Sequence, residues 1–331
     1  MEYHSAQGPQ SAYPQVLLLG NGLNRAFGGE SWGGLIKKFW KNDDILYDDN
    51  PQVKEVPFPL QVVLGTKDAV DAAILKNRAA LCCLRELSAL RAALEPIWDM
   101  GFDHILTTNY SYELECAADP ALEARLCPKG KCLHKKCPFK AAMSHTSKHA
   151  EMKYLLHTYN VVAHKGREQK IWHIHGEARK PDSIILGHYF YGKLLQNYDK
   201  HFSARADMQR ERQQKGEPPL LESWLDAFIM GDVYILGFGS YFSEWDFWWL
   251  LNRKKRERAR HGKTVFYAPK HAQDTVKHEL LKVYGVDVRN LGFDEDTLTC
   301  AGKAYDRSAF FRAFCHAAIE DMQTDRNTTE K

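Results

Sequence analysis

The chain has 331 residues, of which 44% are hydrophobic and 26% charged, ordinary values for a soluble globular protein. Its formal net charge of +3 is too close to neutral to indicate a nucleic-acid-binding protein by itself. No apolar run approaches the roughly 20 residues of a membrane-spanning helix, and the N-terminus lacks a signal-peptide layout. We therefore expect a cytoplasmic protein with no membrane partner and with reduced cysteines.

The first predicted unit runs from Gln15 to Ile36. The apolar run Val16 to Leu19 is typical of a strand buried on both faces, and Gly20-Asn21-Gly22 interrupts it before an amphipathic segment. An α/β protein holds phosphate with such a unit, because glycines let the backbone approach and free N–H groups face the anion. The dinucleotide fingerprint would have a third glycine where Arg25 stands, so a tight turn without a ligand fits this stretch equally well.

Short apolar strands and longer helices alternate along the remaining chain, after a flexible segment at residues 1–12. We predict a loop at 43–59 and helices at 68–98, 188–197, 205–219, 220–230, 244–260 and 305–322. The predicted later strands are 102–106, 171–174, 183–186, 233–236, 264–268 and 286–290. This pattern predicts an α/β fold with a doubly wound, mostly parallel, Rossmann-like sheet. We expect a single domain over residues 13–325, with helical insertions, a basic Cys/His-rich insertion at about 120–155, and a flexible C-terminus at 326–331.

Four predicted strands end in small or polar residues. These ends are Gly20-Asn21-Gly22, Thr107-Thr108-Asn109, His175-Gly176 and Gly237-Phe238-Gly239-Ser240. In open parallel sheets, ligands bind beyond the carboxyl ends of the strands. The four ends together therefore predict a nucleotide site.

Two side chains at these ends are candidates for chemistry. His175 has a ring whose ordinary pKa suits abstraction of a proton from a ribose hydroxyl or a water, and Gly176 leaves it accessible. His173 lies on the same strand face and is the alternative, but the strand-end position favours His175. The amide of Asn109 can bind a ribose hydroxyl or orient a water, although a plain turn residue explains it equally well.

Taken together, these stretches resemble the sirtuin-like domain found in many bacterial defence proteins. The resemblance covers roughly residues 15–255 and is closer to anti-phage effectors, such as that of the Thoeris system, than to protein deacylases. The matching stretches are Gly20-Asn-Gly-Leu-Asn24 with Ser31-Trp32, Ile105-Leu-Thr-Thr-Asn-Tyr110, Ile174-His-Gly176, Ser183-Ile-Ile-Leu-Gly187 with Tyr189 and Tyr191, and Gly237 to Asp246.

The resemblance implies roles for individual residues toward NAD⁺, bound as a substrate. Asn109 corresponds to the asparagine that contacts the nicotinamide ribose, and His175 to the general base. Asp246 matches an acid at a helix start, where it could also complement the helix dipole. The remaining implied binding residues are Gly20, Asn21 and Gly22 at the pyrophosphate, Asn24 in place of a frequent serine, Thr108 beside Asn109, and Gly237 and Ser240 on the adenosine side.

Several departures from the family pattern separate the possible activities. After Gly176 the chain has neither the two Cys-x-x-Cys pairs nor the Phe-Gly-Glu segment of deacylases, so water is the expected acceptor. The resemblance then implies an NAD⁺ hydrolase that releases nicotinamide and ADP-ribose and depletes NAD⁺ during phage infection. Ser111 stands where the family often has aspartate, and the adenine-side Asn-x-Glu segment is not evident. A deacylase, an ADP-ribosyltransferase, and a non-catalytic subunit that binds NAD or ADP-ribose remain alternatives.

The basic segments suggest partners. The insertion contains four residues that could hold a structural zinc, but their spacing matches no common zinc pattern, and a solvated basic loop is the alternative. These residues are Cys127, Cys132, His134 and Cys137. The basic runs 129–140 and 253–263 are either solvated surface or nucleic-acid contacts. Because a constitutively active NADase would poison its host, we expect a homo-oligomer or a complex with a regulatory sensor protein.

Overall fold

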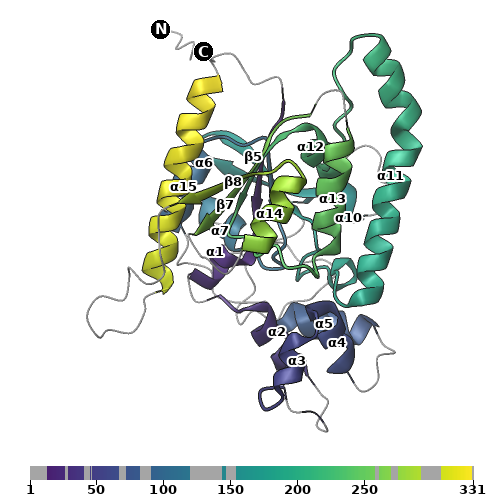
Figure 1. Ribbon diagram of the computed structural model, residues 1–331, viewed down its shortest axis with the longest axis vertical. Coiled ribbons are helices and arrows are strands. Elements are labelled where there is room, and N and C mark those ends of the chain that lie inside the picture. The colour runs from purple at the N-terminus through teal and green to yellow at the C-terminus, as the bar shows by residue number, and fades with distance from the viewer. Residues whose placement is uncertain are drawn as a thin grey trace.

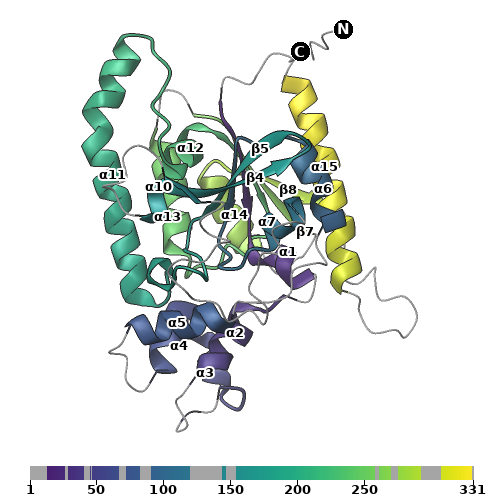
Figure 2. The same ribbon diagram turned by 180° about the vertical axis from the view of Figure 1, so that it is seen from behind.

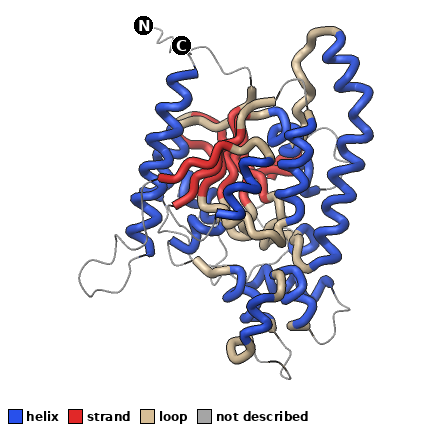
Figure 3. The backbone as a smooth tube through the Cα atoms, in the orientation of Figure 1, coloured by secondary structure: helices blue, strands red, loops and turns tan. Residues whose placement is uncertain are grey.

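The computed structural model describes residues 13–26, 29–40, 45, 47–66, 72–82, 91–119, 144–146, 154–257, 261–269, 275–291 and 307–329. Its centre is an eight-stranded sheet in the order β3-β4-β5-β2-β1-β6-β7-β8 (Figures 1 and 3). The strands are β1 Gln15–Leu19, β2 His104–Thr107, β3 Ser144–Thr146, β4 Thr158–His164, β5 Arg167–His173, β6 Asp232–Leu236, β7 Thr264–Pro269 and β8 Asp287–Leu291.

Strands β5, β2, β1, β6, β7 and β8 are parallel, whereas β3 and β4 are antiparallel additions at one edge. Strand β1 pairs with β2 on one side and with β6 on the other, so the strand order reverses across β1. This reversal is the switch point at which α/β sheets bind ligands. The predicted doubly wound, mostly parallel α/β fold is confirmed.

Strand β1 is buried on both faces, as its unbroken apolar run predicts. Leu17 and Leu19 face one hydrophobic cluster, and Val16 and Leu18 face the other. The first cluster lies under the helices α6 Arg91–Asp99, α7 Glu113–Ala118 and α15 Arg307–Thr329. The second cluster lies under the helices α10 Tyr154–His157, α11 His188–Gln214, α12 Trp224–Met230, α13 Trp245–Arg256 and α14 Thr275–Val283. Figures 1 and 2 show these two layers on opposite faces of the sheet.

A group of short helices lies beyond the carboxyl ends of the strands, below the sheet in Figures 1 and 2. It consists of α2 Trp32–Phe39, α3 Pro51–Glu55, α4 Phe58–Leu64 and α5 Ala72–Cys82, and it follows the short helix α1 Asn21–Ala26. The loop predicted at 43–59 is wrong in part, because Asn50 caps α3 and Pro51 occupies its first turn, where proline needs no N–H partner.

Three further predictions differ from the structure. Residues 183–186 do not form a strand: the 3₁₀ turn η2 Pro181–Ser183 precedes them, and they are buried without joining the sheet ladder. The helices predicted at 188–197 and 205–219 are the single helix α11, since no Gly or Pro between them stops it at 198–204. Strand β4 is absent from the predicted strands. Its buried positions are Thr158, Asn160 and Val162, so polar residues interrupt the apolar face that would mark it.

The Cys/His-rich run at 127–140 lies outside the described residues, so the zinc prediction is not tested there. Within 120–155, the structure describes Ser144–Thr146 and the start of α10. In the described part of the chain, no helix is long and apolar enough to cross a bilayer.

Candidate active site

The glycine turn after β1 packs directly on the turn after β6. The Gly20 N–H donates to the Leu236 carbonyl over 3.0 Å, and the Gly22 N–H donates to the Gly237 carbonyl over 2.7 Å. A Cβ atom at Gly20 would lie 2.4 Å from Phe238 Cα, and one at Gly22 would lie 2.5 Å from the Gly237 oxygen. Glycine is therefore required at both positions because two backbones meet at the switch point.

A small pocket lies between the start of α1, the loop before α2 and the segment after β2. It is lined by Asn21, Asn24, Glu30, Ser31, Trp32, Leu35, Asn109, Tyr110 and Ser111. Asn21 donates from Nδ2 to the Glu30 carbonyl over 2.9 Å, which ties the two sides of the first loop together. The buried Asn24 Oδ1 has no hydrogen-bond partner among the described residues. The structure thus brings together three predicted residues, Asn21, Asn24 and Asn109.

The backbone of Asn109 is held at both of its polar groups. Its N–H donates to Thr107 Oγ1 over 3.1 Å, and its carbonyl lies 2.7 Å from His173 Nδ1. The next residue, Tyr110, donates its hydroxyl to the Ile185 carbonyl over 2.6 Å. Thr108 is buried in the same turn. The main chain of Asn109 is therefore held in place where the residue lines the pocket.

His175 lies in the segment that continues β5, one residue before a tight turn. Its side chain is buried at 2% exposure, so the accessibility expected from Gly176 is wrong. Gly176 has φ 93°, and a Cβ there would lie 2.3 Å from the Ser183 carbonyl oxygen. His175 Nε2 lies 2.7 Å from Asp246 Oδ2, in the first turn of α13. Because a carboxylate only accepts, a neutral His175 ring carries its proton on Nε2. The lone pair is then on Nδ1, which has no partner in the described structure.

The surroundings of Asp246 are buried and acidic. Burial and the charge of Asp246 raise the pKa of the Glu244 carboxyl well above its usual value. Burial, with the same charge, raises the pKa values of Tyr191 and Tyr198. The two tyrosines are therefore neutral near pH 7, and the His175 ring packs edge-on against Tyr191 at a centroid distance of 5.6 Å. Asp246 and His175 thus meet in a buried site, where their side chains are 2% and 3% exposed.

His173 occupies a different position from His175, although only two residues separate them. Its Nε2 lies 2.7 Å from Glu115 Oε1, while its Nδ1 faces the Asn109 carbonyl. Burial disfavours the charged ring, but the charge and hydrogen bond of Glu115 outweigh that effect and raise the pKa of His173 to about 9. Glu115 was not among the site residues predicted from the sequence. It lies in α7, all of whose residues are buried, and a glutamate at such a position is the one sign of a specific role.

The turn after β6 contains two residues with left-handed backbone. Gly237 has φ 66° and Ser240 has φ 41°, which is uncommon for a residue with a side chain. The Ser240 hydroxyl is fully buried and has no partner in the part of the chain described. The predicted residues Gly237, Ser240, His175 and Asp246 lie at the same sheet edge as Asn109 but do not line the Asn109 pocket.

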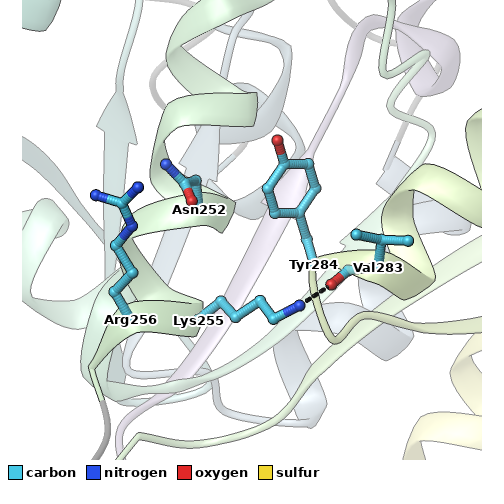
Figure 4. A pocket seen from close by; sticks show the side chains of 5 residues that line it. All are labelled: Asn252, Lys255, Arg256, Val283 and Tyr284. Carbon is cyan, nitrogen blue, oxygen red and sulfur yellow. Dashed lines mark hydrogen bonds between the residues drawn. The ribbon is translucent and has the colours of Figure 1, made fainter.

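A second pocket lies at the far end of α13, away from the carboxyl ends of the strands. Asn252, Lys255, Arg256, Val283 and Tyr284 line it, and Lys255 donates to the Val283 carbonyl (Figure 4). None of the predicted site residues lines this second pocket, so we do not assign the pocket to the active site.

The described part of the basic run 253–263 is not a uniformly solvated surface. Lys254 is buried and donates to the carbonyls of Phe228 and Gly231, and burial lowers its pKa to about 7. Arg253 pairs with Glu257 at 2.8 Å. Within the described ranges, no group of three or more His, Cys, Asp or Glu side chains could hold a metal ion.

Comparison with known protein families matches residues 103–288 to the family described as "SIR2-like domain". The match covers more than half of the chain, from the residue before β2 into β8, and includes Asn109, His175 and Asp246. SIR2-like domains use NAD⁺ as a substrate, which indicates an NAD-related activity. A search of curated proteins gives no match.

Proposed function

We propose that this chain, which belongs to the SIR2-like domain family, hydrolyses NAD⁺ to nicotinamide and ADP-ribose. The observation that carries the proposal is the His175 ring. Its Nε2 is fixed on Asp246, and its Nδ1 lone pair is unpartnered in the described structure. A histidine oriented in this way by a carboxylate is arranged to accept a proton.

In the proposed reaction, the bond between the nicotinamide nitrogen and ribose C1′ breaks, and nicotinamide leaves as a neutral molecule. A water oxygen bonds to C1′, and the released proton passes to His175 Nδ1 and then to solvent. The Asn109 amide contacts the nicotinamide ribose or the attacking water. Because nicotinamide is a good leaving group, positioning and charge stabilisation supply most of the catalysis.

The sequence after Gly176 favours water over a peptide as the acceptor. It has neither the paired Cys-x-x-Cys motifs nor the Phe-Gly-Glu segment of deacylases. By analogy with the defence effectors that the chain resembles, we propose that it depletes cytoplasmic NAD⁺ during phage infection. A free NADase would harm its host, so we also propose control by oligomerisation or by a partner protein. Nucleic-acid binding by the basic runs would be one trigger.

Incubation of the purified full chain with NAD⁺, followed by chromatography of the products, tests this function. We expect equal amounts of nicotinamide and ADP-ribose, and the same assay with Asn109→Ala should show almost none. Release of nicotinamide with ADP-ribose attached to protein would instead indicate an ADP-ribosyltransferase. Turnover only with an acylated peptide would indicate a deacylase. Binding without any product, with candidate oligomeric states and partners supplied, would indicate a non-catalytic subunit.

A further inference from the structure

We infer that His173 is a positioning residue, whose doubly protonated ring holds the main chain of Asn109 in place for the reaction. This inference deepens the proposed function and rests on Asn109 acting in it. It gives His173, which the sequence offered only as the alternative general base, a different role, and it adds Glu115 of α7, which no sequence motif singles out.

The geometry requires two donors on the His173 ring. Nδ1 lies 2.7 Å from the Asn109 carbonyl oxygen, and Nε2 lies 2.7 Å from Glu115 Oε1. A carbonyl and a carboxylate both only accept, whereas a neutral imidazole has one N–H group. With Glu115 ionised, both contacts are satisfied only when the ring is protonated at both nitrogens.

The groups around the ring support that charge. Glu115 is fully buried, and the same Oε1 accepts from Asn160 Nδ2 of β4 over 2.8 Å. The Tyr112 ring packs edge-on against His173 at 5.3 Å and donates its hydroxyl to Glu177 Oε2. Glu177 adds a second negative charge, and burial keeps Tyr112 neutral by raising its pKa. Two carboxylates and one neutral phenol thus face the imidazolium.

Loss of one proton would break the Asn109 contact before the Glu115 contact. A neutral ring beside an anionic Glu115 keeps its remaining proton on Nε2, so the Nδ1 lone pair faces the Asn109 carbonyl and repels it. Asn109 would then move from its position in the pocket. Glu115→Gln changes this outcome, because the glutamine amide can donate to Nε2 while Nδ1–H stays on the Asn109 carbonyl, provided that the Asn160 amide turns so that its oxygen faces the glutamine NH2.

The test is the pH profile of nicotinamide release from NAD⁺ by the full chain. For the wild type, we expect kcat to fall as pH rises through about 9, the pKa of His173. Glu115→Gln should remain active and lose this alkaline fall. His173→Leu should lower kcat roughly 10- to 100-fold at neutral pH with little change in KM. Asp226→Asn is the matched control, since it alters another buried histidine–carboxylate pair, His201–Asp226 at 2.9 Å, and should keep the wild-type profile.

Nuclear magnetic resonance of ¹⁵N-labelled histidine and asparagine gives a readout that does not depend on turnover. We expect both His173 nitrogens to be protonated at neutral pH in the wild type and one in Glu115→Gln, with the Asn109 amide signal following the wild-type titration. A singly protonated wild-type ring, or an unchanged alkaline fall in Glu115→Gln, overturns the inference. A wild type that leaves NAD⁺ intact overturns the proposed function instead, and the resonances still decide whether His173 holds Asn109.

Discussion

Two groups of buried polar side chains, one at each edge of the parallel sheet, differ in their hydrogen bonding. At the amino edge, Lys254 donates to the carbonyls of Phe228 and Gly231, and Asp232 accepts from Gln15 Nε2 and from the Lys263 N–H. Apart from Gln15 Oε1, the polar atoms of these three side chains are paired, whereas the buried Gln169 amide near the start of β5 has no partner among the described residues. At the carboxyl edge, buried atoms with no partner among the described residues occur after β1, after β5 and after β6. They are Asn24 Oδ1, His175 Nδ1 and Ser240 Oγ.

This difference separates a structural role from a functional one. Burial lowers the pKa of Lys254 to about 7. Its ammonium nevertheless has a structural role, because it donates to the Phe228 and Gly231 carbonyls at the end of α12. A shifted pKa therefore marks burial, whereas unused hydrogen-bonding capacity at a switch point marks a place for a ligand. Substitutions at the two edges should accordingly affect different properties.

The largest expected effect is that of Asp246→Asn at the carboxyl edge. The asparagine amide can donate to His175 Nε2, which moves the ring proton to Nδ1 and removes the base. We expect kcat for nicotinamide release to fall by roughly 10²- to 10⁴-fold, as when a histidine is held in the wrong tautomer. Steady-state kinetics measure this, and urea denaturation should show a stable fold. Wild-type kcat in a variant of unchanged stability would contradict the role of Asp246.

At the amino edge, Lys254→Met should act on stability instead. It keeps the side-chain length but leaves the buried carbonyls of Phe228 and Gly231 without their donor. We expect the free energy of unfolding to fall by roughly 1–3 kcal/mol, with kcat unchanged per folded molecule. Urea denaturation and the nicotinamide assay on the same sample measure both properties. A drop in kcat without a loss of stability would show that Lys254, at the amino edge, affects activity directly.

The pH dependence of stability sharpens the comparison at His173. Its folded pKa is raised from 6.5 to about 9, so the stabilisation is complete below pH 6.5 and disappears as pH rises through about 9. Across this window the wild type should lose up to about 3 kcal/mol relative to Glu115→Gln. Denaturation of both proteins at several pH values provides the test. Parallel stability curves would mean that the His173–Glu115 pair is not charged.

The smallest expected effect is that of Ser240→Gly. Glycine adopts φ 41° without the penalty that a side chain has there, so the free protein should gain roughly 0.5–1 kcal/mol of stability. If the buried hydroxyl contacts NAD⁺, the same change should raise KM several-fold. Denaturation and substrate titration measure the two changes. Greater stability with an unchanged KM would remove Ser240 from the binding site.

The strands at the centre of the fold could be predicted from sequence because their burial on both faces produces unbroken apolar runs, as in β1 and β6. Residues 184–186 produce a similar run but are buried beside a 3₁₀ turn, which an apolar pattern cannot distinguish from a strand. Strand β4 is missed for the opposite reason. It is a strand without an apolar run, because its buried positions include the polar residues Thr158 and Asn160.

For the site, the strand-end rule located Asn109 and His175 but could not pair them with other side chains. Asp246 is 71 residues from His175, and Glu115 is 58 residues from His173. Local sequence contains no information on which carboxylate meets which ring, because the helices α7 and α13 determine it through packing. The two histidines lie on one strand face in the sequence, whereas the structure gives them different carboxylate partners, Glu115 for His173 and Asp246 for His175.

The most direct test of the central claim is release of nicotinamide from NAD⁺ by the wild type, His175→Ala and Lys254→Met, measured side by side under the conditions that activate the wild type. Substitution at the carboxyl edge should abolish release, whereas Lys254→Met should retain the wild-type rate per folded molecule. Release by His175→Ala at the wild-type rate would contradict the claim that its oriented ring supplies the base for NAD⁺ hydrolysis.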